Sequence, residues 1–90
     1  MSIRVHLYSR LPTLAGNRNL IEVEGKTVAE CLNDLMRQFP ELKPVLFDAQ
    51  GQLWSTIFIS INLNSPQSEP LTRIVNEKEE LYIILIAAGG

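Results

Sequence analysis

The residues that most clearly suggest a chemical role are Gly89 and Gly90, the last two of the sequence, which follow Ala87 and Ala88. Glycine has no Cβ, so a run of such small residues can thread a channel that excludes larger ones. A carboxylate at the end of that run is a group that a second protein could reach and activate. The plainer alternative is a frayed end, because chain termini are often disordered. We expect residues 87–90 to form a flexible tail.

The other reactive side chains are too few for the usual catalytic or metal-binding sets. Cys31 is the only cysteine and His6 the only histidine, which excludes an internal disulfide and a site built from several Cys and His ligands. Cys31 lies among apolar neighbours in an expected helix, where it is more often a small core residue than a nucleophile. Glu30 and Asp34 have no partner for acid–base chemistry, so we expect them on a solvated helix face. We predict no metal site.

The composition is that of an ordinary small globular domain. Ninety residues make one domain. The net charge of −2 provides no electrostatic attraction to nucleic acid or to an anionic membrane. No apolar run approaches the roughly 20 residues that span a bilayer, and the first residues do not resemble a signal peptide. We expect a cytoplasmic protein that binds neither nucleic acid nor membrane.

Alternating side chains predict the strands. Residues 3–8 and 20–24 alternate between apolar and polar types, which is typical of half-buried strands. The turn residues between them indicate a hairpin with a long loop. Residues 57–61 predict a third strand, and the apolar run at residues 80–86 predicts the last.

One amphipathic helix is predicted after the second strand. Thr27 and Glu30 have the spacing of a capping box, in which the Thr27 hydroxyl accepts from the Glu30 N–H and the Glu30 carboxylate accepts from the Thr27 N–H. Apolar residues then recur at helical spacing until Pro40, which lacks a backbone donor and ends the helix. Residues 42–47 predict a short helical turn that closes one end of the core, and residues 71–75 predict another.

These elements predict an α+β fold, a mixed sheet of four to five strands with one main helix packed on one face. We expect the first and last strands to lie side by side and parallel in the centre, with the helix across them. That is the β-grasp, or ubiquitin-like, architecture. Residues 1–86 would form this single domain and residues 87–90 the tail that ends in Gly-Gly. A ferredoxin-like fold would need a second helix of comparable length.

The order of several short motifs resembles the MoaD/ThiS-type family of ubiquitin-like sulfur carrier proteins, which includes the small subunit of molybdopterin synthase. The resemblance covers nearly the whole chain, and the ending at residues 79–90 is its most specific part. The internal motifs that carry it are residues 3–8, Gly16, residues 25–32, residues 46–48 with 51–53, and residues 57–62.

The resemblance implies a carrier that is not an enzyme and that binds no cofactor itself. An E1-like adenylating partner of the MoeB/ThiF type would use ATP and Mg²⁺ to adenylate the Gly90 carboxylate. Sulfur from a persulfide donor would then replace AMP and leave a thiocarboxylate. Gly90 would carry the chemistry, and Gly89 would give the partner access to it.

Several acceptors are compatible with this resemblance. We favour a pterin precursor in molybdopterin biosynthesis, with a molybdopterin synthase large subunit as the sulfur-accepting enzyme. Delivery in cysteine or thiamine biosynthesis is the alternative, although the thiamine carriers are usually shorter. A ubiquitin-like modifier that forms isopeptide bonds with lysine would use the same terminus. An interaction domain in which the two glycines are incidental is a further alternative.

The last strand departs from the family pattern in two places. Residues 76–80 occupy the turn where members often have Gly-Asp, and residues 85–88 stand where many members have a proline. Without that proline the strand can pair further along the sheet, which would shorten the free tail.

The sheet face that points away from the helix is expected to be apolar. Alternation places on it Tyr8, Phe58, Tyr82, Ile84 and Ile86. Exposed apolar patches tend to mark interaction sites, so we predict that this set, with Ala87 and Ala88, docks the activating or the sulfur-accepting enzyme. The alternatives are cover by residues 41–56 or 62–75, and self-association. We expect Trp54 to anchor the turn beside it rather than to contact a partner.

Overall fold

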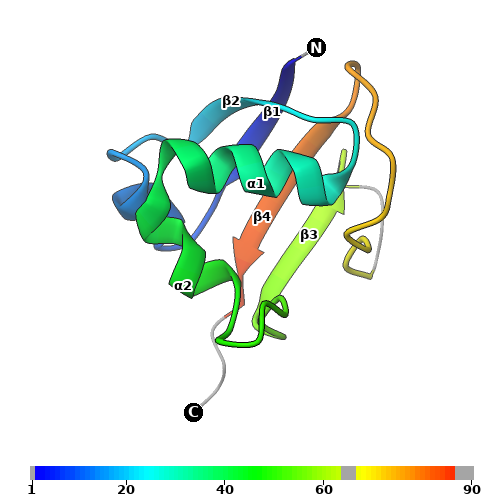
Figure 1. Ribbon diagram of the computed structural model, residues 1–90. Coiled ribbons are helices and arrows are strands. Elements are labelled where there is room, and N and C mark those ends of the chain that lie inside the picture. Colours follow the sequence, from blue (N-terminus) through cyan, green and yellow to red (C-terminus); the bar gives the residue numbers. More distant parts are fainter. Residues whose placement is uncertain (1, 64–66, 87–90) are drawn as a thin grey trace.

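The fold consists of a mixed sheet with the helices packed against it (Figure 1). The computed structural model describes residues 2–63 and 67–86. The strands are β1 (Ser2–Leu7), β2 (Leu20–Glu24), β3 (Ile57–Ile61) and β4 (Glu80–Leu85), in the spatial order β2-β1-β4-β3. β1 and β4 are parallel neighbours in the centre, and each has an antiparallel partner outside it, β2 and β3 respectively. This is the predicted β-grasp arrangement, with four strands in the described residues.

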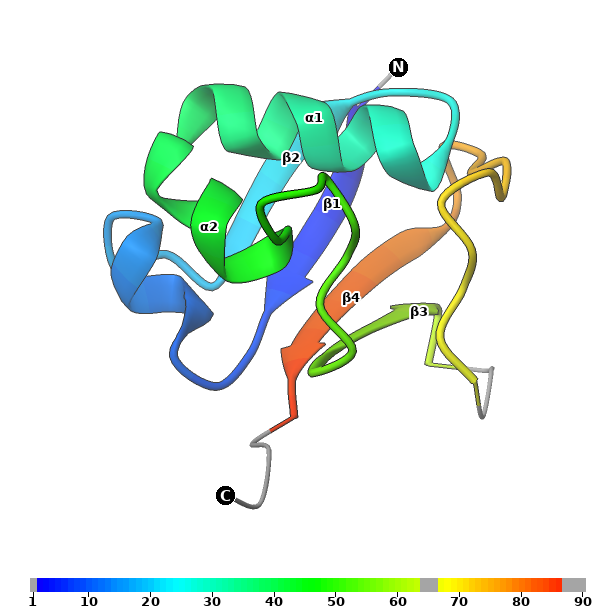
Figure 2. The ribbon, with the colours of Figure 1, turned by 60° about the horizontal axis from the view of Figure 1, so that its bottom comes forward.

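The helices lie on one side of this sheet (Figure 2). α1 (Val28–Gln38) crosses the strands, and Pro40 follows its last turn as predicted. A 3₁₀ turn at Pro40–Leu42 continues into the one-turn helix α2 (Lys43–Leu46). Leu42 and Leu46 are fully buried, so this segment closes one end of the core as expected. The loop between β1 and β2 contains a further 3₁₀ helix, Leu11–Leu14.

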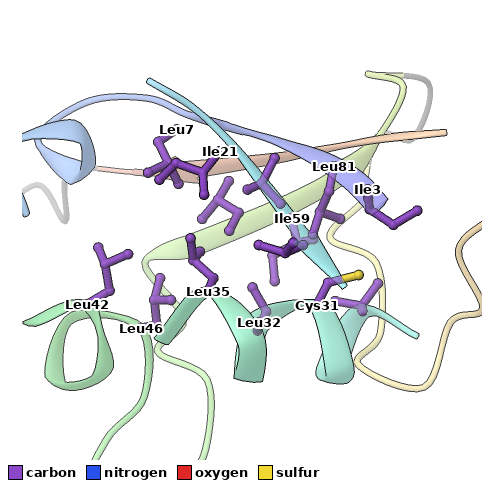
Figure 3. Close-up of a cluster of buried hydrophobic side chains, with 14 of the residues drawn as sticks. Ile3, Leu7, Ile21, Cys31, Leu32, Leu35, Leu42, Leu46, Ile59 and Leu81 are labelled. Atoms are coloured by element: carbon purple, nitrogen blue, oxygen red, sulfur yellow. The ribbon is translucent and has the colours of Figure 1, made fainter. Parts of the chain in front are cut away.

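The core lies between α1 and the sheet face that points toward it (Figure 3). The sheet contributes every second residue of each strand, including Ile3, Ile59 and Leu81, all at most 1% exposed. Leu32 and Leu35 of α1 are fully buried against them. Truncating a buried leucine to alanine typically costs about 2–5 kcal/mol, so these contacts are what hold the helix on the sheet.

The start of α1 is capped differently from the prediction. The Thr27 hydroxyl accepts from the Glu30 N–H at 3.2 Å as expected, but the Glu30 carboxylate accepts from the backbone N–H of Lys26 at 2.8 Å, not from Thr27. Thr27 instead forms an antiparallel bridge with Ile74. The hydrogen bonds of that bridge use Val28 N–H and Lys26 O, and the glutamate caps the N–H one residue before the predicted one.

The same bridge explains why residues 71–75 are not the predicted helical turn. They form a turn, closed by Arg73 N–H donating to Pro70 O at 3.1 Å, and then run alongside the start of α1. Val28 N–H donates to Arg73 O at 2.9 Å, and Val75 N–H donates to Lys26 O at 2.8 Å. Pairing with a neighbouring segment satisfies backbone groups that a helix would otherwise satisfy internally.

Side chains cover parts of both outer edges of the sheet. On β2, the Asp34 carboxylate accepts from Glu24 N–H at 2.9 Å, and the Gln38 amide donates to Glu22 O at 3.0 Å. On β3, the backbone of Ile59 is paired on its outer side, where the Ser68 hydroxyl accepts at 3.0 Å and Glu69 N–H donates at 2.7 Å. Covered edges offer fewer groups for pairing with another chain.

We predict that Asp34→Asn destabilises the fold at neutral pH and reduces its sensitivity to acid. The N–H of Glu24, and then Arg37, hold the pKa of Asp34 below its ordinary value of 3.8. A carboxyl with a lowered folded-state pKa stabilises the fold above the unfolded-state pKa, and this contribution is lost as the pH falls through the folded-state pKa. We expect the substitution to cost about 1 kcal/mol at pH 7 and clearly less near pH 3.

Urea unfolding followed by Trp54 fluorescence at both pH values measures this difference. Glu41→Gln is the matched control, because it removes one carboxylate from an exposed position. An Asp34→Asn penalty that is the same at pH 3 as at pH 7 would contradict the assignment.

Candidate functional site

The candidate site begins where β4 leaves the sheet. The four predicted tail residues, Ala87, Ala88, Gly89 and Gly90, lie outside the described residues, and the description of the chain ends at Ile86. β4 runs toward the end of the sheet where α2 and the loop before β3 lie (Figure 1). β4 is a central strand that is paired on both sides. It leads to residues 87–90, the segment that we expect to carry the chemistry.

Hydrogen bonds hold the end of this strand on both sides. Toward β3, Ile86 N–H donates to Thr56 O at 2.6 Å. Toward β1, Tyr8 N–H donates to Ile83 O at 3.1 Å, and the Ser9 hydroxyl donates to Leu85 O at 2.9 Å. Pairing thus extends one residue past β4, as expected for a strand without the proline that many family members carry.

Sequence reasoning missed Ser9 and Thr56 as parts of this site. Ser9 and Leu85 are 76 positions apart in the chain, and neither Ser9 nor Thr56 belongs to a recognisable motif. The one available signal was the expected parallel pairing of the first and last strands, which brings the residues just after β1 close to the end of β4.

The predicted partner-binding residues of the described chain do share the sheet face opposite α1. Phe58 and Ile84 are cross-strand partners and are half-buried. Tyr8 is 43% exposed and Ile86 50% exposed. Together with Tyr82 they form what we call the apolar half of the open face, and it lies beside the exit of β4.

The other half of the open face is charged, which the sequence reasoning did not anticipate. Glu80 accepts a hydrogen bond from His6 Nε2 and pairs with Arg4, whose Nη2 lies 3.3 Å from Glu80 Oε2. His6, and to a smaller extent Arg4, lower the pKa of Glu80. Glu22 is the cross-strand neighbour of Arg4 on β2. The open face is therefore apolar near the exit of β4 and charged at its far end.

Stacked rings join the two halves. The His6 and Tyr82 rings stack with centroids 4.3 Å apart and planes 10° apart, and Tyr8 stacks on Tyr82 at 6.1 Å. Partial desolvation raises the pKa of the Tyr82 phenol. Stacked ring pairs of this kind contribute stability beyond the area that they bury, so the three rings support one another on the open face.

Two side chains with nucleophilic or acid–base potential, Cys31 and Asp34, are engaged in the fold. Cys31 is fully buried, and burial, followed by the charges of Glu30, Asp34 and Glu24, raises its pKa to about 11. The thiol is therefore protonated at neutral pH, and the core interpretation is confirmed. Asp34 is less solvated than expected, because its carboxylate also accepts from Arg37 Nε at 2.8 Å.

Trp54 anchors the loop before β3, as predicted. Its indole N–H donates to Pro44 O at 3.1 Å, and its backbone N–H donates to Leu46 O at 3.0 Å. The ring nevertheless remains 44% exposed. This loop includes Thr56, so the anchor also supports one side of the exit of β4.

The described residues hold neither a metal-binding cluster nor a helix suited to a bilayer. Within residues 2–63 and 67–86, no group of three or more His, Cys, Asp or Glu side chains is arranged to hold a metal ion. Among the helices of the same residues, none has the length and apolar character needed to cross a membrane.

Comparison with solved structures identifies similar folds over the whole chain. Small archaeal modifier protein 1 from Haloferax volcanii is 24% identical with a TM-score of 0.86, and all of each chain is covered. The same protein from Methanosarcina acetivorans is 26% identical with a TM-score of 0.81, covering 99% of this chain and 96% of that one. A chain of the BexX/CysO complex from Amycolatopsis orientalis is 25% identical with a TM-score of 0.80, covering 98% and 99% respectively.

The similarity to these structures agrees with the resemblance and confirms the β-grasp fold predicted from the sequence. No protein-family model matches the sequence, and no curated protein matches it.

We predict that Cys31 in the folded protein resists modification by a small aromatic disulfide reagent at pH 8. Its burial and its pKa of about 11 leave almost no accessible thiolate. Absorbance of the released thiolate measures the reaction, and the same protein in concentrated urea is the control that should react rapidly. Equal rates in the two states would show that Cys31 is an accessible nucleophile.

Proposed function

We propose that this protein is a ubiquitin-like sulfur carrier whose Gly90 carboxylate is adenylated by an E1-like enzyme and then converted to a thiocarboxylate. The observation that carries the proposal is the end of β4. It is held by hydrogen bonds to Ser9 and Thr56, beside an apolar half-face, and leads directly into Ala87-Ala88-Gly89-Gly90. The proposal assigns catalysis to the partners and presentation of the carboxylate to this chain.

The chemistry needs no side chain of the carrier. A carboxylate is a poor electrophile, and its attack on ATP, with Mg²⁺ bound by the partner, forms an acyl adenylate and releases pyrophosphate. A persulfide sulfur then attacks the acyl carbon and AMP leaves. A thiol then attacks the donor's sulfur in the resulting acyl disulfide, which releases the thiocarboxylate and forms a disulfide between the thiol and the donor. This division of labour agrees with the buried, protonated state of Cys31.

The proposed partners are an E1-like adenylating enzyme of the MoeB/ThiF type and a sulfur-accepting enzyme. For the acceptor we retain the molybdopterin pathway, with a molybdopterin synthase large subunit, as the first proposal. The similarity to a chain of a BexX/CysO complex supports a carrier that docks on a partner enzyme, and cysteine or thiamine biosynthesis are the alternative destinations. Isolation of the sulfurated chain with its acceptor would distinguish them.

Protein modification is the second candidate function. Three of the similar structures are of small archaeal modifier protein 1, and a carboxylate activated as an adenylate can also acylate a lysine amine, with AMP as the leaving group. The proposed site is the same for both functions, and the product separates them.

We predict that the chain isolated from its native host includes a form whose intact mass reflects the exchange of one oxygen for one sulfur. Mass spectrometry locates the exchange at Gly90, and removal of Gly89 and Gly90 abolishes it. A host that lacks the E1-like enzyme is the control and should yield only the unmodified chain. Recovery of the chain solely as conjugates on target lysines would replace the carrier proposal with the modifier.

We also predict that Phe58→Asp, or separately Ile84→Asp, raises the KM for adenylation by about tenfold. Each change places a charge in the apolar half of the open face, and the two are tested singly because they are cross-strand partners and two carboxylates would repel.

Ile74→Asp is the matched control, because Ile74 is 72% exposed but pairs with Thr27 beside the start of α1. Circular dichroism confirms that each variant is folded. A KM that is unchanged by the two open-face variants would remove this surface from the docking step.

A further inference from the structure

Ser9 combines an unfavourable backbone conformation with a specific contact. Its φ is +64°, a left-handed conformation that is costly for a residue with a Cβ. Its hydroxyl donates to Leu85 O at 2.9 Å although the residue is exposed. Strained conformations persist where the surrounding structure imposes them, and they often mark functional positions.

The hydroxyl replaces a backbone donor at the point where β1 turns away. The last backbone bond on this side of β4 runs from Tyr8 N–H to Ile83 O. In a continued parallel ladder the next bond would come from Arg10 N–H to Leu85 O. The chain instead turns at Ser9, and Leu11 N–H donates back to Tyr8 O at 3.3 Å. The Ser9 side chain thus provides the missing donor.

On the side of β4 that faces β3, hydrogen bonding extends equally far along the strand. Thr56 O accepts from Ile86 N–H at 2.6 Å. Thr56 lies in the turn closed by Ile57 N–H donating to Trp54 O at 3.0 Å, and that turn is anchored by the Trp54 indole. We call Ser9, Leu85, Ile86 and Thr56 the exit clamp.

We propose that the exit clamp fixes the point from which Gly90 is presented, and that Ser9 is a positioning residue that limits the reach of the carboxylate. This inference rests on the proposed carrier function. Four residues follow Ile86 up to Gly90, and a fully extended chain of four residues spans at most about 14 Å. If Leu85 and Ile86 were released as well, six residues would span at most about 22 Å.

The kind of partner follows from this limit. With the clamp closed, a reaction centre can be used only if it lies within about 14 Å of the exit of β4. A partner that docks on the apolar half of the open face must therefore place its adenylating centre at the end of a short, narrow channel. The clamp contributes to specificity because an enzyme with a deeper centre would have to break its hydrogen bonds.

The first test uses the protein alone. Hydrogen exchange of the Ile86 amide, followed by NMR, should accelerate between about threefold and tenfold in Ser9→Ala. Ser9→Gly should show the same acceleration even though glycine relieves the positive φ, which separates loss of the hydroxyl from strain in the loop. Thr13→Ala is the matched control, since the Thr13 hydroxyl lies in the same loop and donates to Arg10 O at 2.6 Å.

The second test measures reach. ATP–pyrophosphate exchange is assayed with the E1-like adenylating enzyme of the same organism, purified, with ATP and Mg²⁺. Deletion of Ala87 shortens the tail by one residue and should lower kcat at least tenfold with little change in KM, because docking is untouched. Adding Ser9→Ala to this deletion should recover at least threefold in kcat, whereas adding Thr13→Ala should recover nothing.

The outcomes separate this inference from the function on which it rests. Unchanged Ile86 exchange in both Ser9 variants overturns the clamp, whatever the adenylation result. Accelerated exchange without recovery of kcat in the shortened chain overturns the role of Ser9 in setting reach. If the unaltered protein supports no pyrophosphate exchange at all, the proposed function fails, while the hydrogen-exchange result still decides whether the clamp exists.

Discussion

The parallel pairing of β1 with β4 is the constraint on which the rest of the structure depends. It brings Leu7 beside Ile83 across nearly the whole length of the chain, and it requires the intervening segment to cross from one side of the central pair to the other. α1 makes that crossing and covers one face of the sheet as it does so. Side chains alternate along each strand, so the register also determines which residues face α1 and which form the open face.

The same pairing determines where the last strand ends relative to the loop after β1. Because the two strands run in the same direction, the residues that follow β1 lie beside the end of β4, where Ser9 can bond to Leu85. An antiparallel pair would have placed the start of β1 there instead. The exit of β4 is thus a consequence of topology, and only the last hydrogen bond depends on a single side chain.

Local sequence patterns predict the elements well, and non-local contacts account for what they miss. Alternation at residues 3–8 and 57–61 and the periodicity that ends at Pro40 describe interactions between near neighbours, and each appears in the structure within a residue or two. The Glu30 carboxylate was assigned to Thr27 because the pattern is local, whereas in the structure it accepts from the N–H of Lys26, beside the contact of residues 26–28 with the distant residues 73–75. Contacts between residues 74 or 76 positions apart, such as Glu80 with His6 and Ser9 with Leu85, have no local signature.

The division of the open face has a physical basis in the neighbours of each strand. Near the exit, β4 lies between Phe58 of β3 and Tyr8, so Ile84 is flanked by two aromatic side chains that carry no charge. At the other end, Arg4 lies between Glu22 and Glu80, so three strands place alternating charges in one row. A partner that buries the apolar half gains hydrophobic free energy in proportion to the area covered, whereas the charged row contributes mainly to orientation. Under the proposed function the chain would dock on one enzyme, dissociate and dock on another, and this combination would specify orientation without the stability that a wholly apolar interface would give the complex.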